Sequence, residues 1–506
     1  MRVGGRGEIG RRCRLKIGFL WSAGSSPAVR TTALRIGALL ASAAVAACDR
    51  RADTGPVTVS AIEGERSPGS APLPARLLAD ATEQGLVRFD AGGQIEPGLA
   101  ERWIVIDEGR SYIFRLRQAE WANGTAVTAD QVAAALRRRL AARGNPLRPF
   151  LTAVDEVVAM TPEVLEVRLG RQRPDLLKLF AQPELAISRT GRGGTGPMRV
   201  VSATPHVLLR PALDPARADP DDPRELQPQE DVRLIDERAA LAVARYVDRR
   251  SDLVAGGDFA TWPLLATVQV PPAEVRVDPA VGLFGLAVVR RDGFLADAAN
   301  RAAVAQALDR VAITAAVAPA WEPADRLLPE QLDSAAPPAA PAWTALPLAE
   351  RRAAARAVVT AASADGPVRL RVAMPRGPGA TRLYGQIVAS LIAIGITPER
   401  VGWSEPADLR LIDEVAPYDS GRWYLASACR PCGAEAAQAL AAARDAPTIT
   451  LRSQEIARAD RLLTDDAAFI PIARPLRWSL VAPRLRQWQP NARAWHPLNR
   501  LRSEPN

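Results

Sequence analysis

The sequence predicts a mixed α/β protein with more than one domain. Its 506 residues are enough for roughly two to four domains of ordinary size. Apolar residues make up 48% of the chain and charged residues 24%, a balance that is typical of globular proteins and excludes a disordered or collagen-like chain. Helical and strand patterns alternate between residues 349 and 402, which favours an architecture of strands covered by helices.

Residues 1–47 are predicted to be a signal peptide. Within them, residues 36–47 form an apolar run that follows two arginines and is too short to span a bilayer. The run ends in Val-Ala-Ala before Cys48, a pattern that resembles a bacterial lipobox, so we expect cleavage before Cys48 and acylation of its thiol. The alternative is an ordinary cleavage site beside a chance cysteine. A true start near Val29 would give a leader of conventional length.

The positive charge of the chain is concentrated in this leader. Residues 1–47 hold eight basic residues and one acidic residue, a net charge of +7 out of +9 for the whole chain. The remaining +2 over residues 48–506 does not support a nucleic-acid-binding surface, and we expect no nucleic-acid partner. Residues 48–56 are expected to be a lipidated tether between the membrane and the folded body.

Polarity patterns predict the order of the elements. Residues 112–117 alternate in polarity as a half-buried strand does, and Asn123-Gly124 is a strong turn signal. Thr128, three residues before Gln131, predicts a capping box at the start of a helix. The other predicted strands are at 57–62, 155–169 (two strands), 367–374, 397–402 and 467–472, and residues 232–260 are predicted to be a strand–helix–strand unit. Helices are predicted at 76–90 (followed by a turn at Gly85), 296–317 (with Val304, Leu308 and Val311 on one face), 349–363, 380–394 and 450–464. Loops are predicted at 211–231 and 333–347.

Signatures of catalysis are missing from the sequence. It contains no His-Glu-x-x-His, no Gly-x-Ser-x-Gly and no phosphate loop, and His206 and His496 are its only histidines. Gly191-x-Gly193-x-x-Gly196 has the form of a dinucleotide fingerprint, but a proline and then a strand pattern follow it, so we interpret it as a turn entering a strand. Carboxylate-pair chemistry stays open with 56 acidic residues. We expect a protein that is not an enzyme and needs no cofactor.

Cys429 and Cys432 form a Cys-Arg-Pro-Cys motif before a helical pattern. In an exported protein this spacing is compatible with a local disulfide. A redox pair is the alternative, because a following helix would lower the pKa of a thiol, although no thioredoxin-like unit surrounds the motif. A zinc site would need two further ligands and both histidines lie far away in sequence, so we expect no metal.

Five landmarks between about residues 76 and 495 resemble one protein family. They are residues 85–90 (GLVRFD) with 97–103 (PGLAERW), 112–117 (YIFRLR) with 121–132 (WANGTAVTADQV), 194–197 (GTGP), 301–310 (RAAVAQALDR) and 470–472 (IPI). In this order they are similar to the extracytoplasmic solute-binding proteins of the dipeptide, oligopeptide and nickel ABC importers, family 5.

The resemblance implies a two-lobed fold like that of periplasmic binding proteins of class II, with two crossing strands as the hinge. By the family layout, lobe I spans residues 54–268 and 476–506 and contains an extra subdomain at 89–190, and lobe II spans 269–475. The implied function is capture of a peptide or peptide-like small polar solute in the cleft between the lobes and its delivery to an ABC permease in the inner membrane. The protein would then be a periplasmic lipoprotein anchored to that membrane.

Candidate ligand-binding residues follow from the same resemblance. Peptide binders of the family fix the amino terminus of the ligand with an Asp in a W-x-x-D-Y segment, and here Pro417 stands at that position. We therefore expect Asp413, Glu414 or Asp419 to take over the amine contact, unless they are loop acids at the cleft rim. Candidate cleft aromatics are Tyr418, Trp423 and Trp262.

Two other functions remain open at this point. The altered segment between residues 412 and 432 is compatible with an envelope interaction or chaperone module that keeps the fold without transport. An oxidoreductase that uses Cys429 and Cys432 would require a lowered thiol pKa.

Overall fold

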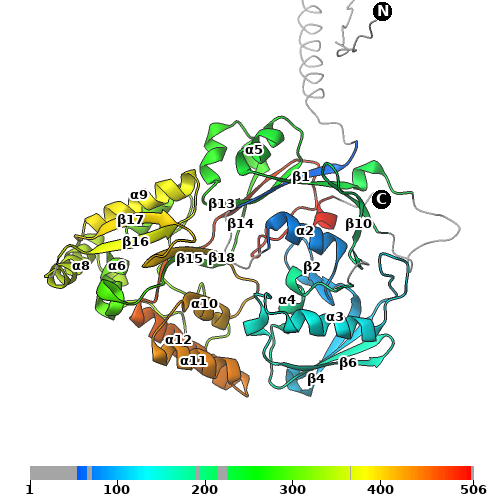
Figure 1. The fold of residues 1–506 in the computed structure, drawn as a ribbon, viewed down its shortest axis with the longest axis horizontal. Helices are drawn as coiled ribbons and strands as arrows, with labels where there is room; N and C mark the ends of the chain where they lie inside the picture. Colours follow the sequence, from blue (N-terminus) through cyan, green and yellow to red (C-terminus); the bar gives the residue numbers. More distant parts are fainter. Residues whose placement is uncertain (1–53, 65–70, 190–192, 213–224, 365, 503–506) are drawn as a thin grey trace, which may run out of the picture. The chain divides into compact units, whose positions relative to one another are not determined.

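The computed structural model describes residues 54–64, 71–189, 193–212, 225–364 and 366–502 (Figure 1). The predicted signal peptide, Cys48 and the tether up to residue 53 lie outside these ranges, as do Gly191 and residues 213–224 of the predicted loop. Among the described helices, none is both long and apolar enough to cross a membrane.

A seven-stranded sheet forms the first half of the fold. Its central strand β1 pairs in parallel with its two neighbours, and all six residues of β1 are buried, as expected for a strand covered on both faces. Helices α2 (Leu73–Thr82) and α5 (Ala239–Val247) lie on opposite sides of this sheet (Figure 1). The strands, in spatial order, are β10 (Met198–Ser202), β11 (Val207–Pro211), β12 (Val232–Glu237), β1 (Val57–Ile62), β13 (Leu253–Asp258), β20 (Arg477–Val481) and β14 (Val275–Asp278).

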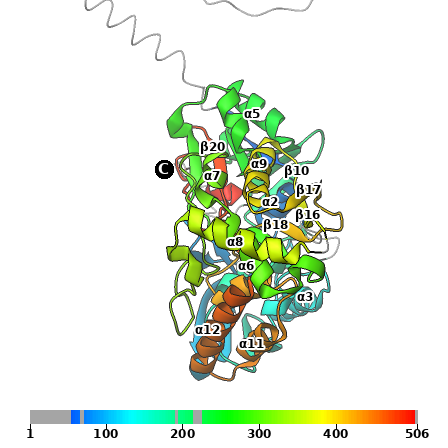
Figure 2. The same cartoon turned by 90° about the vertical axis from the view of Figure 1, so that its left-hand side faces the viewer.

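A five-stranded sheet forms the second half. Its strands, in spatial order, are β17 (Thr397–Gly402), β16 (Arg369–Met374), β18 (Leu409–Val415), β15 (Gly282–Val288) and β19 (Phe469–Ala473). The helices of this half are α6 (Ala298–Ala307), α7 (Arg310–Ala315), α8 (Leu348–Ala362), α9 (Pro378–Ile392), α10 (Gly421–Ala428), α11 (Ala434–Asp445) and α12 (Ile449–Asp466), and Figure 2 shows α8 and α6 side by side above α12. The strands and helices predicted between residues 349 and 402 and the last helix and strand are confirmed to within a few residues.

The part of the chain between β1 and β10 forms an additional unit around a four-stranded antiparallel sheet. Its order is β4 (Ala100–Ile106), β5 (Ser111–Leu116), β7 (Val164–Leu169) and β6 (Val154–Thr161), with α3 (Ala129–Ala141) packed on β6 and β7. The predicted strand at 112–117 and the strand pair at 155–169 are confirmed. Smaller elements are β2 (Val87–Phe89), β3 (Ile95–Pro97), β8 (Ser188–Arg189), β9 (Gly193–Gly194), α4 (Leu176–Phe180) and the short 3-10 helices η1 (Asp107–Gly109), η2 (Arg148–Phe150), η3 (Pro183–Leu185), η5 (Pro228–Glu230), η6 (Trp262–Thr267), η7 (Pro272–Glu274), η8 (Gly293–Ala296), η9 (Ala342–Ala345) and η10 (Leu498–Arg500).

The part of the glycine motif that the structure describes, residues 193–196, leads into strand β10, as predicted. It packs against the carboxyl end of α2, where a Cβ added to Gly196 would lie 2.3 Å from the carbonyl carbon of Thr82. Glycine is therefore required by the close approach of two backbones and not by a phosphate group.

The predicted capping box at Thr128 is wrong. Thr128 is the residue that precedes α3, but its side chain makes no cap hydrogen bond. The side-chain oxygen of Gln131 instead accepts a hydrogen bond of 2.6 Å from the indole N–H of Trp121. The indole of Trp121 thus uses the side-chain acceptor of Gln131 that the local sequence pattern predicts for the start of the helix.

The single helix predicted at 296–317 is also wrong, because the chain breaks it into α6 and α7. Leu308 adopts an extended backbone conformation, and the side chain of Asp309 then caps α7 by accepting a hydrogen bond of 3.0 Å from the Ala312 amide. The break changes which residues after it face the core. Val304 and Leu308 are buried as predicted, whereas Val311 is 65% exposed.

Candidate functional site

Two adjacent chain crossings connect the sheets. β14 ends at Asp278 and leads through residues 279–281 into β15, while β19 leads through residues 474–476 into β20. Since β14 pairs with β20 and β15 pairs with β19, the two crossings lie side by side. In this structure β14 belongs to the seven-stranded sheet, although the family layout places residues from 269 onward in lobe II. The lobe boundaries otherwise stay predictions.

A cavity of about 560 Å³ lies against both crossings. This volume is within the range of small-molecule sites, roughly 300–1,000 Å³. Its aromatic walls are Trp262, from η6, and Trp321, which stacks edge-on against Phe284 at 4.7 Å between ring centroids. Charged side chains of Glu322, Asp325 and Arg326 also line it. Apolar walls with charged groups suit a small solute that carries both apolar and polar parts.

The loop that forms one wall of this cavity is fixed to the second crossing. The indole N–H of Trp321 donates a hydrogen bond of 2.8 Å to the carbonyl oxygen of Arg474. The Arg474 guanidinium in turn donates to the carbonyl oxygens of Arg326 and Leu327, at 3.1 and 3.0 Å. A motion of the crossing would therefore move the cavity wall with it.

Trp262 is the only one of the six candidate ligand-binding residues that lines this cavity. The other five lie on β18, on the loop after it and on α10. Trp423 is a buried residue of α10 whose ring meets Tyr424 edge-on at 5.0 Å. The structure thus separates the candidates into one cavity residue and a group at 413–423.

Asp413 joins the two sheets. Its carboxylate accepts a hydrogen bond of 2.9 Å from Arg477, the first residue of β20. Burial raises the pKa of Asp413 to about 6, an effect that Arg477 opposes and Asp258 reinforces. Its role in this structure is to connect β18 to the second crossing.

The raised pKa predicts a pH dependence of stability. Asp413 has a reference pKa of 3.8, so its contribution to the free energy of unfolding is fully present below about pH 4 and is lost as the pH rises through about 6. In Asp413→Asn this loss is absent, and we expect the variant to gain about 2 kcal/mol relative to the wild type between pH 4 and 6.5, a value that allows for solvent screening. Urea denaturation at several pH values measures it. A difference between the two proteins that does not change with pH would contradict the assignment.

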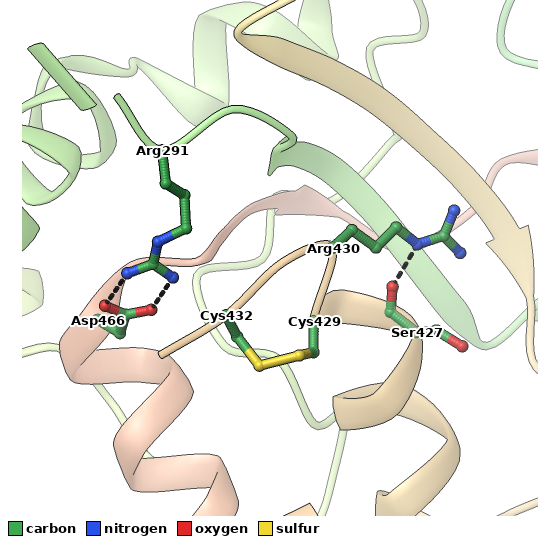
Figure 3. The surroundings of a disulfide bond; sticks show 6 residues. All are labelled: Arg291, Ser427, Cys429, Arg430, Cys432 and Asp466. Atoms are coloured by element: carbon green, nitrogen blue, oxygen red, sulfur yellow. Dashed lines mark hydrogen bonds and ion pairs between the residues drawn. A yellow bond between two sulfur atoms is a disulfide. The ribbon is translucent and has the colours of Figure 1, made fainter. Parts of the chain in front are cut away.

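Glu414 is paired within its own half of the molecule. Both carboxylate oxygens accept hydrogen bonds from Arg430, at 2.8 and 2.9 Å. Arg430 lies between Cys429 and Cys432, which a disulfide joins (Figure 3). Figure 3 also shows the backbone of this loop held by the bond from Arg430 Nε to the Ser427 carbonyl oxygen, 2.6 Å long. These bonds fix the C-terminal end of α10, and Glu414 is already paired with Arg430.

Removal of this disulfide is expected to lower stability without abolishing folding. The bond closes a loop of only four residues, for which the loss of unfolded-chain entropy corresponds to about 2 kcal/mol. We expect the double variant Cys429→Ser/Cys432→Ser to lose that free energy of unfolding in urea denaturation. Reductant should destabilise the wild type by a similar amount and leave the variant unchanged. An equal response of both proteins to reductant would contradict this prediction.

Tyr418 and Asp419 contact the additional unit and the C-terminal segment. The Tyr418 ring is buried and meets Phe150 edge-on at 5.9 Å. Asp419 forms ion pairs with Lys178 and Arg493. Burial opposes ionisation of Asp419, but the hydrogen bonds from these two cations lower its pKa below the usual value. Asp419 is thus an ionised carboxylate that already holds two internal cations.

Further hydrogen bonds join the same surfaces, which we call the 416–423 interface. Gln182 donates to the carbonyl oxygen of Pro417 at 2.7 Å, and Arg493 donates to that of Ala416 at 2.9 Å. Arg422 donates to the carbonyl oxygen of Pro149 at 3.2 Å. This interface connects the second half of the fold with the additional unit.

Several residues of these sites were not predicted from the sequence. Lys178, Arg477 and Arg493 supply the partners of the candidate carboxylates, and Trp321 faces the cavity. Of these residues, only Lys178 stands out in the sequence, since it is one of two lysines among 65 basic residues. Among the described residues, no group of three or more His, Cys, Asp or Glu is placed to hold a metal ion.

Comparisons with known proteins support one family. Residues 94–219 match the model of bacterial extracellular solute-binding proteins, family 5 Middle. A stretch of 57 residues, 11% of this chain and 10% of the relative, is 44% identical to the probable deoxycholate-binding periplasmic protein YgiS of Escherichia coli (strain K12). Another, of 80 residues and 14% of either chain, is 44% identical to the probable di/tripeptide-binding protein 5 of Pseudomonas aeruginosa (strain UCBPP-PA14). The chain thus matches only a small part of the length of these curated relatives.

The structural comparison covers most of the chain. The murein tripeptide binding protein MppA of Escherichia coli is similar with a TM-score of 0.75 at 18% identity, over 89% of this chain and 98% of that chain. The unliganded open form of MppA gives a TM-score of 0.62, also at 18% identity, over 89% of this chain and 96% of that chain. This likeness confirms the predicted α/β fold of the two-lobed periplasmic binding proteins.

Proposed function

We propose that this chain, whose residues 94–219 match the model of bacterial extracellular solute-binding proteins, family 5 Middle, serves an ABC importer. In this proposal it captures a peptide or peptide-like small polar solute between its two lobes and delivers it to a permease in the inner membrane. A lipid on Cys48 would keep it at that membrane on the periplasmic side. The observation that carries the proposal is the cavity of about 560 Å³ beside the two crossings.

The charged groups of the structure limit how such a solute would be held. Asp413, Glu414 and Asp419 are each paired with an arginine or lysine of the chain. A ligand amine at these positions would have to displace an internal cation, which lowers the affinity for an ordinary peptide amino terminus. We propose that the solute contacts Trp262 and Trp321 with its apolar part and the charged cavity residues with its polar part.

A thermal-shift screen of the full chain tests the proposed function. The panel contains di- to pentapeptides, glutathione, opines, sugars and metal chelates. A solute at a hundredfold its dissociation constant stabilises the folded protein by about 2.7 kcal/mol, which gives a clear increase in Tm. If no solute of the panel raises the Tm of the folded protein, the proposal is contradicted. That result would favour the interaction-module alternative, which the internal pairing of the three carboxylates supports.

Trp262→Ala is expected to weaken binding of the solute found in this screen. The substitution removes an aromatic wall of the cavity, and loss of a buried aromatic contact reduces affinity at least tenfold. Trp403→Ala is the matched control, because Trp403 is a half-buried tryptophan that does not line this cavity. Isothermal titration compares the two variants. Equal affinities would exclude the cavity as the binding site.

A further inference from the structure

A second cavity, of about 130 Å³, lies within the helical part of the second half. It is lined by residues of α6, α7, α12, β19 and η9 and of the loop at 325–327, and the proposed function does not use it. The volume is enough for several water molecules or for one small anion. Its lining combines apolar side chains with two polar groups that the rest of the protein leaves incompletely bonded.

The first of these groups is the guanidinium of Arg310. Arg310 is 7% exposed, and its Nε donates a hydrogen bond of 2.8 Å to the carbonyl oxygen of Pro471. Nη1 donates to the carbonyl oxygens of Ala305 and Leu308, at 3.1 and 3.5 Å. Nη2 is buried and has no hydrogen-bond partner among the residues that the structure describes. One edge of a buried cation is therefore unsatisfied.

The second group is the hydroxyl of Thr464, on α12. Its Oγ1 is also buried, lines the same cavity and has no partner within the described ranges. Buried polar atoms in folded proteins nearly always have a hydrogen-bond partner, and leaving such an atom without a hydrogen bond costs about 1–3 kcal/mol. Two such atoms on one cavity indicate an occupant that accepts hydrogen bonds from both.

The charges around the cavity indicate the sign of that occupant. Within the described chain no carboxylate lies within ion-pair distance of Arg310, which stacks on the Trp343 ring at 5.2 Å. Arg351 stacks on the same ring at 5.5 Å. The carboxylates of Asp325 and Asp465 also line the cavity, but Asp465 is exposed and Asp325 is 43% exposed, so solvent screens both.

Burial, together with the like charge of Arg351, lowers the pKa of Arg310 to about 10, a shift that the carboxylate of Asp325 opposes, so the guanidinium remains charged at neutral pH. Water would satisfy its free N–H without adding negative charge beside the buried cation, whereas an anion would satisfy the N–H and add that charge. We propose that this cavity binds a small monovalent anion, a halide or a carboxylate no larger than acetate, through Arg310 Nη2 and Thr464 Oγ1. The proposal does not depend on the proposed function: Asp325 lines both cavities, but Arg310 and Thr464 line only this one.

Bromide is the probe that tests the anion site. The full chain is crystallised without chloride and soaked in sodium bromide, and the anomalous signal locates the ion. We expect a bromide peak in this cavity within hydrogen-bond distance of Arg310 Nη2. Ordered water alone, or an empty cavity, at a bromide concentration that saturates surface sites would overturn the proposal.

A solution measurement uses conservative variants on α12, because Arg310→Met removes several hydrogen bonds and is expected to disturb folding. The Tm of the full chain is measured against sodium bromide at constant ionic strength. We expect Thr464→Val to raise the bromide concentration for half-maximal stabilisation at least threefold. Thr450→Val, on the exposed face of the same helix, should match the wild type. An unchanged midpoint in Thr464→Val would contradict the assignment of this hydroxyl.

Discussion

Arg301→Met is expected to destabilise the protein by about 3 kcal/mol, the lower end of the range measured when one partner of a buried ion pair is removed. Arg301 is 2% exposed and pairs with the Asp466 carboxylate at the end of α12. Its Nε also donates to the carbonyl oxygen of Asp466 at 2.8 Å, and Nη1 donates to those of Leu295 and Ala296 at 2.8 and 2.6 Å. The substitution therefore leaves three carbonyl oxygens without this donor, of which the one on Leu295 belongs to a fully buried hydrogen bond.

The position of Arg301 explains why the effect should be large. Its cation lies at the carboxyl end of α12, where the helix dipole is negative. It also connects α6 to α12. Arg291 binds the same carboxylate from another loop (Figure 3), so Asp466 keeps one cation and the loss stays at the lower end of the range for buried ion pairs. Urea denaturation of the full chain measures the loss. Arg290→Met is the matched control, because Arg290 and its partner Asp292 are 59% and 61% exposed and such pairs contribute little. Equal stabilities of the two variants would contradict this role.

Asp419→Ala is expected to separate the surfaces of the 416–423 interface. It leaves Lys178 and Arg493 without their shared carboxylate, and the Arg493 side chain is only 8% exposed. Because Asp419 is 37% exposed and Lys178 is 36% exposed, solvent screens part of this loss, which we expect to be about 1–2 kcal/mol, enough to shift a two-state equilibrium roughly tenfold. We therefore expect a larger radius of gyration in the absence of solute.

Small-angle X-ray scattering of the full chain measures this change. Asp292→Ala provides the control, because it removes an exposed carboxylate from a site outside the interface. A radius of gyration in Asp419→Ala equal to that of the control would show that Asp419 does not hold these surfaces together.

The fold could be predicted where the signal is local. The alternation at 112–117 and the turn at Asn123-Gly124 report directly on backbone conformation and burial, and both strands and helix followed as expected. The capping box failed because Gln131 had a competing partner in Trp121, which no local pattern specifies. The break between α6 and α7 depends on one capping aspartate inside an otherwise regular helical pattern.

The candidate site was less accessible to sequence reasoning. Asp413, Glu414 and Asp419 are close in the chain, but what they can bind depends on their cations. Three of these cations are distant in sequence: Arg477 on β20, Lys178 on α4 and Arg493 in the C-terminal segment. Burial and pairing, which decide whether a carboxylate is free for a ligand, are properties of tertiary structure. Trp262 could be named as a candidate, but its neighbour Trp321 in the cavity could not.

The most direct test of the central claim is equilibrium binding of a solute to the full chain. Isothermal titration with the strongest stabiliser from the thermal-shift screen measures stoichiometry and affinity together. The account predicts saturable binding of one solute per chain, weakened at least tenfold in Trp262→Ala and unchanged in Trp403→Ala. Folded protein that gives no saturable heat with any stabilising solute, or the same affinity in both variants, would contradict it.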